Sequence, residues 1–161
     1  MTKYADRVIT LEFKPGRGGG NAKELCPVNG EALGGLNFNF IIGVYENTGD
    51  WAPGMGAHSH SFDECLLFFG YDDNDLNYLG SDMSLAVGKE QEIHKFSVPM
   101  VVAAPRGMSH CPLITEKVYN RFGHFHLAID PLLPKDRHGG AHSPGNVGST
   151  DILARIKTQA R

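Results

Sequence analysis

Glycine and proline interrupt this chain so often that short strands are favoured over long helices. The 161 residues include 20 glycines and 9 prolines, and many of the segments between them are short apolar runs rich in Val, Ile and Phe. No segment shows the sustained 3.6-residue periodicity of a long amphipathic helix. Short β-branched and aromatic runs bounded by turn residues are typical of antiparallel sheets. The pattern therefore predicts an all-β fold.

Seven segments have the composition of strands, namely residues 8–13, 36–45, 65–69, 83–87, 91–96, 100–104 and 119–129. In the second segment, Asn37 and Asn39 share one face, while Phe38, Phe40 and Ile42 share the other. The segment 65–69 is apolar on both faces, which indicates a strand that is covered on both sides. Gly88-Lys89-Glu90 predicts a hairpin between the fourth and fifth segments.

Length, charge and cysteine content narrow the class of protein. A chain of this length is typical of one domain. The net charge is −3, with 15 basic and 18 acidic residues and no dense Lys/Arg run, so we expect no nucleic-acid partner. No apolar run is long enough to span a bilayer, and no signal-like segment is present, so we expect a cytoplasmic protein without a membrane partner. Cys26, Cys65 and Cys111 lack CxxC spacing, which fits a reducing compartment.

Two clusters carry the chemistry. His58-Ser59-His60-Ser61-Phe62-Asp63-Glu64 has the pattern H-x-H-x-x-x-E, and Pro105-Arg106-Gly107-Met108-Ser109-His110 has the pattern P-x-G-x-x-H. On a strand, His58 and His60 share a face, and a turn at Phe62-Asp63 can return Glu64 beside them. Three imidazoles and one carboxylate suit a divalent Fe, Mn, Ni, Zn or Cu ion with open coordination positions. Either cluster alone is weak evidence, since a lone HxH or a turn followed by histidine is usually structural.

Together the two clusters resemble the two signature motifs of the cupin superfamily. The resemblance implies an antiparallel jelly-roll β-barrel over residues 36–130, in which His58, His60, Glu64 and His110 are the metal ligands. Residues 1–35 would then supply an N-terminal strand and a Gly-rich loop that pack on the barrel. Residues 131–161 would form an irregular tail with a short helix near its end. Three features depart from the family pattern: five residues instead of six between Glu64 and Gly70, no Asn shortly after His110, and a long segment between the motifs.

The resemblance leaves the reaction open, because cupins include oxygenases, decarboxylases, isomerases, lyases and non-catalytic binding or sensing domains. An oxygenase acting on a small organic molecule is favoured, because three histidines and a carboxylate with open positions suit Fe(II). A metal-dependent lyase, isomerase or decarboxylase is the alternative. A small-ligand-binding or sensing cupin without turnover is a third reading.

Three further residues are candidates for the pocket. His124 and His126 share a face of the last predicted strand, where either can serve as general base or substrate anchor, or make core hydrogen bonds instead. Arg106 can clamp a substrate carboxylate at the mouth of the site, or remain a solvated turn residue. The two-faced apolar segment 65–69 and the family resemblance also predict a homodimer.

Overall fold

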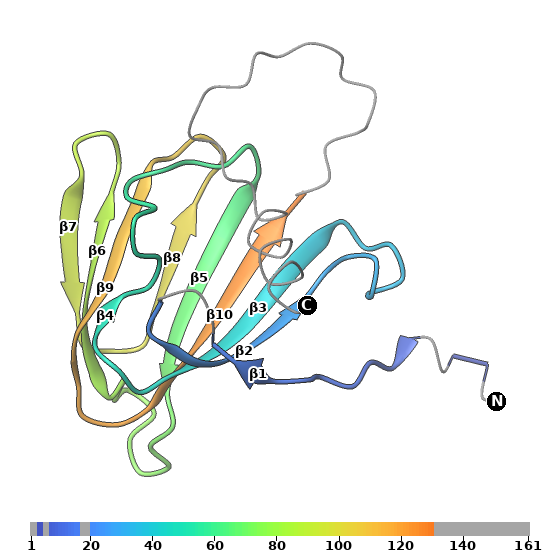
Figure 1. Cartoon of the computed structure of the whole chain (residues 1–161), viewed down its shortest axis with the longest axis horizontal. Coiled ribbons are helices and arrows are strands. Elements are labelled where there is room, and N and C mark those ends of the chain that lie inside the picture. Colours follow the sequence, from blue (N-terminus) through green and yellow to red (C-terminus); the bar gives the residue numbers. More distant parts are fainter. Residues whose placement is uncertain (1–2, 5–6, 17–19, 131–161) are drawn as a thin grey trace.

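The computed structural model describes residues 3–4, 7–16 and 20–130, and within these ranges it contains ten strands and no α-helix. The strands form two antiparallel sheets (Figure 1). One sheet has the order β1-β2-β3-β10-β5-β8, and the other has the order β4-β9-β6-β7. In chain order the strands are β1 (Lys14–Pro15), β2 (Ala22–Val28), β3 (Phe38–Tyr45), β4 (Gly49–Asp50), β5 (Asp63–Gly70), β6 (Ser81–Val87), β7 (Glu92–Phe96), β8 (Met100–Ala104), β9 (His110–Val118) and β10 (Phe122–Ile129).

Strands β3 to β10 follow a jelly-roll path. From β3 onward the chain passes from one sheet to the other at every connection except the β6–β7 hairpin. Strand β10 pairs along its whole length with β3 on one side and with β5 on the other. Two sheets connected in this way by eight antiparallel strands define a jelly roll. The prediction of an all-β, antiparallel jelly-roll fold is confirmed.

The hydrophobic core fills one part of the space between the sheets. Its buried members are Tyr45, Leu66, Phe68, Leu79, Met83, Leu85, Phe96, Leu113 and Phe122. Phe68, Leu79 and Phe122 expose no surface, and burying a side chain of this size contributes about 1.5–3 kcal/mol. Glu64 lies four residues before Phe68 on the same face of β5 and is also buried. The interior therefore changes from apolar to polar along this strand.

Strands β3 and β10 turn polar side chains such as Asn39 and His124 inward beside the core residues Tyr45 and Phe122. Asn39 is 6% exposed, and its Oδ1 accepts a hydrogen bond of 2.8 Å from the backbone N–H of Gly30. On the opposite face, the rings of Phe40 and Phe125 lie 5.3 Å apart between centroids. The predicted division of residues 36–45 into two faces is confirmed, and the face that carries Asn39 is the inner one. This direction places the histidines of β10 inside the fold.

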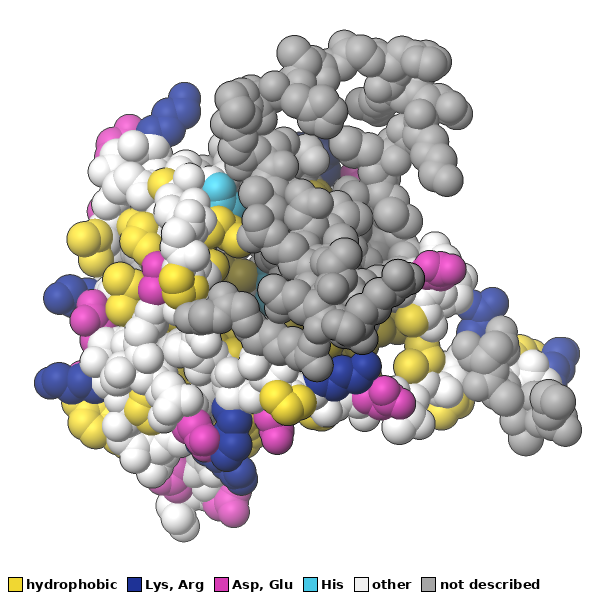
Figure 2. Space-filling view, viewed as in Figure 1, with side chains coloured by type: hydrophobic (Ala, Val, Ile, Leu, Met, Phe, Trp, Pro, Cys, Tyr) yellow, Lys and Arg dark blue, Asp and Glu magenta, His cyan; other side chains and the backbone are white. Residues whose placement is uncertain are grey.

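The N-terminal segment differs from its prediction. Residues 8–13 do not form the strand that their composition predicts, since only Lys14–Pro15 pairs with β2. Within the described ranges no strand pairs with residues 8–13, so their backbone lacks the hydrogen bonds that define a strand. Val8 is 82% exposed, and the segment extends away from the sheets in Figure 1, with hydrophobic side chains at its surface in Figure 2. Strand β2, which contains Lys, Glu and Pro, was not predicted.

The other predicted strands are observed with small shifts. Segments 65–69, 83–87, 91–96 and 100–104 correspond to β5, β6, β7 and β8. Strand β10 begins at Phe122 rather than at Tyr119, because the backbone N–H groups of Tyr119 and Asn120 instead donate to the carbonyl of Gly80. The predicted tail and its terminal helix lie outside the described residues.

Two observations concern the surface. Among the residues that the structure describes, no helix is both long and apolar enough to cross a membrane. On the face shown in Figure 2, the described Lys and Arg side chains are interspersed with Asp and Glu rather than gathered in one patch.

Candidate metal centre

The backbone joins the two histidine motifs directly. His58, in the segment between β4 and β5, forms an isolated antiparallel bridge with His110 at the start of β9. The two residues exchange N–H···O hydrogen bonds of 3.0 and 2.9 Å. The N–H of Gly107 also donates to the carbonyl of His60 at 2.8 Å, and Gly107 has φ 81°, a conformation that favours glycine. The turn of the second motif is therefore attached to the first motif.

The three motif histidines converge. One ring nitrogen from each of His58, His60 and His110 lies within 4.8 Å of the other two. The ring centroids are 4.9 Å apart for His58 and His60, 4.7 Å for His58 and His110, and 5.2 Å for His60 and His110. His60 and His110 are buried, and His58 is partly exposed. Residues far apart in sequence therefore form one compact imidazole cluster.

Glu64 adds a carboxylate to this cluster. From the inner face of β5, its Oε1 lies 3.3 Å from His60 Nε2, and its Oε2 lies 3.0 Å from His110 Nε2. Its side chain is 2% exposed. The four residues with which the two motifs resemble cupin ligands thus lie together between the sheets.

The chain has a cupin-like fold. Its jelly-roll order and the convergence of both motifs between the sheets agree with the resemblance in the sequence. No protein-family model and no curated protein sequence matches the chain.

Solved structures with a similar arrangement are distant. The polyketide cyclase RemF from Streptomyces resistomycificus is 14% identical, with 84% of this chain and 89% of that chain covered and a TM-score of 0.48. Oxalate decarboxylase from Bacillus subtilis is 11% identical, with coverage of 91% and 35% and a TM-score of 0.48. A sugar phosphate isomerase of the cupin superfamily from Silicibacter pomeroyi is 13% identical, with coverage of 74% and 71% and a TM-score of 0.48.

In the cupin-like centre, hydrogen bonds at Nδ1 determine which ring nitrogen of His58 and His110 is free to bind a metal. His58 Nδ1 lies 2.9 Å from the carbonyl of Gly56, and His110 Nδ1 lies 3.2 Å from the carbonyl of Met108. A carbonyl oxygen only accepts, so each Nδ1 carries the proton and each Nε2 is left with a lone pair when the ring is neutral. Metal-binding histidines are commonly oriented by such a second hydrogen bond.

The donor set fits a divalent transition-metal ion. Glu64 Oε2 is buried without a hydrogen-bond partner, 3.0 Å from His110 Nε2. When the histidine is neutral, both atoms present lone pairs, which is unfavourable unless a proton or a cation lies between them. Imidazole nitrogen and carboxylate oxygen are ligands for ions such as Fe, Mn, Ni, Zn and Cu. The residues can therefore hold one such ion.

Burial and mutual charge set the protonation of the cluster. Burial lowers the pKa of His60 to about 4 and also lowers the pKa of His58. For His110, burial acts to lower the pKa, but the Glu64 carboxylate outweighs it and the pKa is raised. Burial alone would raise the pKa of Glu64, but His110 and His126 together lower it. An ionised carboxylate beside neutral imidazoles is the form that binds metal, so His110 releases its proton when an ion binds.

His124 and His126 both lie on the inner face of β10, where the sequence alone had left their direction open. His126 Nε2 is 2.7 Å from Glu64 Oε1, so this histidine contacts the cluster through the carboxylate. His124 is 5% exposed, and its Nε2 has no hydrogen-bond partner. Burial lowers the pKa of His124 well below its usual value. One histidine therefore supports the cluster, and the other is neutral within the core.

An aromatic group that the sequence did not predict surrounds His124. Its ring lies 4.8 Å from Trp51, 5.0 Å from Phe68 and 6.2 Å from Tyr45, measured between centroids. Trp51 stacks on Tyr45 at 3.7 Å, and its Nε1 donates to Thr115 Oγ1 at 2.8 Å. Trp51 follows the two-residue strand β4, and no local pattern in the sequence shows that it reaches the interior.

Arg106 lies apart from the histidines. Its guanidinium is 3.2 Å from Asp63 and 3.6 Å from Asp130, and the side chain is 55% exposed. Its backbone N–H also donates to Asp63 at 2.9 Å. These contacts join the residue after β10 to the first residue of β5 and to the turn that follows β8. In the described structure Arg106 thus serves as an ion-pair partner between strand ends.

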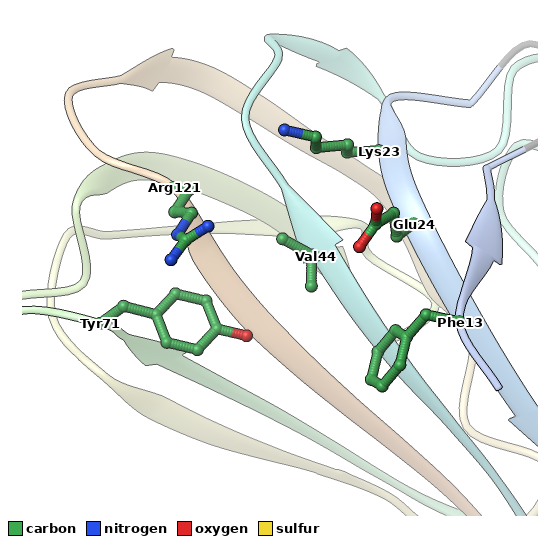
Figure 3. Close-up of a pocket in the computed structure, with 6 residues that line it drawn as sticks. All are labelled: Phe13, Lys23, Glu24, Val44, Tyr71 and Arg121. Carbon is green, nitrogen blue, oxygen red and sulfur yellow. The ribbon is translucent and has the colours of Figure 1, made fainter. Parts of the chain in front are cut away.

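A separate groove lies away from the histidine cluster. It encloses about 330 Å³ and is lined by Phe13, Lys23, Glu24, Val44, Tyr71 and Arg121 (Figure 3). None of its lining residues belongs to either motif, and Arg121 lies over the ring of Tyr71 at 5.5 Å. Glu24 and Val44 are paired across β2 and β3, near the end of the sheet opposite to Glu64. The groove and the candidate metal centre are therefore different places.

Proposed function

We propose that this protein is a metal-dependent enzyme that acts on a small organic molecule, with one divalent ion held by His58, His60, Glu64 and His110. The observation that carries the proposal is the convergence of three imidazoles, two of them buried, beside a carboxylate oxygen that has no hydrogen-bond partner. Structural zinc sites are usually closed and rich in cysteine, whereas four donors of this kind leave coordination positions for a substrate.

Oxygenase chemistry with Fe(II) is the favoured reaction class. Bound ferrous iron supplies a Lewis acid and a source of electrons for dioxygen. The residues of the chain would balance the charge, orient the ligands and limit access of water. Glu64 offsets part of the positive charge, the Nδ1 hydrogen bonds of His58 and His110 fix their rings, and the aromatic group around His124 excludes water from one side.

A test begins with metal content. Purified wild-type protein is dialysed against Fe(II), under anaerobic conditions, and against Mn(II), Ni(II), Zn(II) and Cu(II) in turn, and bound metal is measured by elemental analysis. We expect about one ion per chain for the wild type and a large loss for His60→Ala and Glu64→Ala. His94→Ala, which removes an exposed histidine of β7 paired with Glu92, is the matched control and should retain the metal. Wild-type protein that binds none of these ions would overturn the proposal.

The reaction class is tested by oxygen consumption. Protein reconstituted with Fe(II) is screened against a panel of small hydroxy and keto carboxylates, with oxygen uptake and product formation recorded together. Uptake that matches product supports the oxygenase. Product that forms at the same rate without oxygen contradicts it.

Proton transfer in a lyase, isomerase or decarboxylase is the second candidate. The inward direction of both His124 and His126 favours it, because an imidazole that faces the interior can move a proton of a substrate bound there. If this candidate is right, turnover is independent of oxygen, and solvent deuterium enters the product or the recovered substrate.

A further inference from the structure

The two oxygens of Glu64 have different surroundings. Oε1 is 2.7 Å from His126 Nε2, at hydrogen-bond distance, and 3.3 Å from His60 Nε2. Oε2 makes no hydrogen bond and lies 3.0 Å from His110 Nε2. The side chain of His126 is 14% exposed and that of Glu64 is 2% exposed, so little water competes for this contact. The carboxylate therefore has one engaged oxygen and one free oxygen.

We propose that His126 is a positioning residue that holds Glu64 as a single-oxygen ligand. Its Nε2 is hydrogen-bonded to Oε1 of Glu64, which leaves Oε2 directed to the metal. The proposal rests on the metal centre proposed above. It assigns His126 a function outside both motifs, through the carboxylate rather than through direct contact with a metal.

The strand register places His126 within reach of Glu64. Ala128 of β10 is paired with Glu64 of β5, and His126 is paired with Leu66, so His126 and Glu64 are diagonal neighbours on the inner face. Diagonal neighbours in an antiparallel pair are within reach of long side chains. Because β10 and β5 are interior strands of the six-stranded sheet, their backbone ladders hold both side chains in place.

The hydrogen bond has a consequence for coordination. A carboxylate with both oxygens free can chelate an ion, which occupies two positions and leaves fewer for a substrate. With Oε1 held by a donor, Glu64 offers one oxygen, so three imidazoles and one oxygen make four donors. Partners of this kind fix the orientation and basicity of metal-binding residues, and their loss typically weakens metal affinity about 10- to 100-fold.

The test uses Co(II) as the only added probe. Its affinity is measured by competition with a chromophoric chelator, and its visible absorption is recorded because the intensity falls as the coordination number rises. We expect His126→Phe to bind Co(II) about 10- to 100-fold more weakly than wild type, with a weaker visible band. His126→Gln retains a donor at similar reach and should bind within a few fold of wild type. His94→Phe is the control for loss of an exposed histidine.

A double-mutant cycle shows whether His126 acts through Glu64. Once Glu64→Ala has removed the acceptor, His126→Phe should cause no further loss of Co(II) affinity. Circular dichroism and the unfolding midpoint of the metal-free variants establish folding. His126→Val, which suits a strand, is measured beside His126→Phe so that a folded variant without the donor is available.

Three results would overturn the inference. Wild-type affinity and spectrum in the Phe or Val variant would show that the hydrogen bond has no role in positioning. Affinity as low as that of His60→Ala in both the Phe and Gln variants would make His126 a ligand itself. A further loss in the Glu64→Ala background would show that it acts by another route. Failure of the wild type to bind Co(II) is distinct from all three, because it would refute the metal centre.

Discussion

Replacing His124 by an apolar residue is expected to stabilise the metal-free protein. The imidazole is 5% exposed, its Nε2 has no hydrogen-bond partner, and the rings of Tyr45, Trp51 and Phe68 surround it. A buried polar atom left without a partner costs about 1–3 kcal/mol. His124→Phe removes that cost and keeps a ring for stacking. We therefore expect its free energy of unfolding at pH 7.5 to exceed that of wild type by about 1–3 kcal/mol.

The size of this difference should depend on pH. Burial lowers the pKa of His124 well below its usual value in the folded protein, whereas histidine in the unfolded chain titrates near 6.5. Below that pH the unfolded state binds a proton that the folded state excludes, so wild-type stability falls as pH falls. One such group contributes about 1.4 kcal/mol per pH unit. The advantage of His124→Phe should grow by this amount between pH 6 and pH 5.

Urea unfolding of chelator-treated protein, followed by circular dichroism, measures both effects. Phe is larger than His, and overpacking of a core typically costs about 1–3 kcal/mol, so His124→Leu, which is closer in volume, is measured as well. His94→Phe on the exposed strand β7 should change stability by less than about 0.5 kcal/mol.

One outcome would refute this reasoning. If both apolar variants at position 124 were less stable than wild type at pH 7.5, with a difference that did not change between pH 6 and 5, then His124 Nε2 would have a stabilising partner in the folded protein. A gain in stability combined with lost turnover would instead identify His124 as a group that the protein keeps for function at a cost in stability.

Four further measurements test the core, Arg106, the metal centre and the oligomeric state. Phe68→Ala, at a fully buried site, should lower the free energy of unfolding by about 3–5 kcal/mol in urea titrations; a loss below 1 kcal/mol would contradict the assigned core. Arg106→Ala removes exposed ion pairs with Asp63 and Asp130 and should leave bound metal and the melting temperature nearly unchanged; lost metal would tie it to the centre. Free metal at 100 times its Kd should add about 2.7 kcal/mol of stability, seen as a higher melting temperature that chelation reverses. Light scattering should give the mass of two chains, whereas a mass of one chain would refute the predicted homodimer.

Residue type and spacing were sufficient to predict the β class and the candidate ligands. Glycine and proline mark the turns, and alternation in an extended chain predicts His58 and His60 on one side because neighbouring side chains point in opposite directions. In the structure both histidines lie in the segment between β4 and β5 rather than in a strand. The same alternation correctly separated Asn39 from Phe40. These properties are local, so they are readable from a few neighbouring residues.

Local reading was wrong for residues 8–13, and pairing explains why. Their apolar, β-branched composition is that of a strand, but a strand exists only where a neighbour supplies hydrogen bonds. In the described structure β2 pairs with only Lys14–Pro15 of this region. Strand β2 shows the opposite case. Its Lys, Glu and Pro are not typical of a strand, but it forms one because it pairs with β3.

The sequence by itself determined which residues share a face and which two short motifs carry imidazole and carboxylate groups. Only the tertiary structure decided which face is inside, that His126 contacts Glu64, and that Trp51 packs against His124. Alternation along a strand is symmetric with respect to the two faces of a sheet. The direction is chosen only when the second sheet packs against one of them, and that choice depends on contacts between residues far apart in the chain.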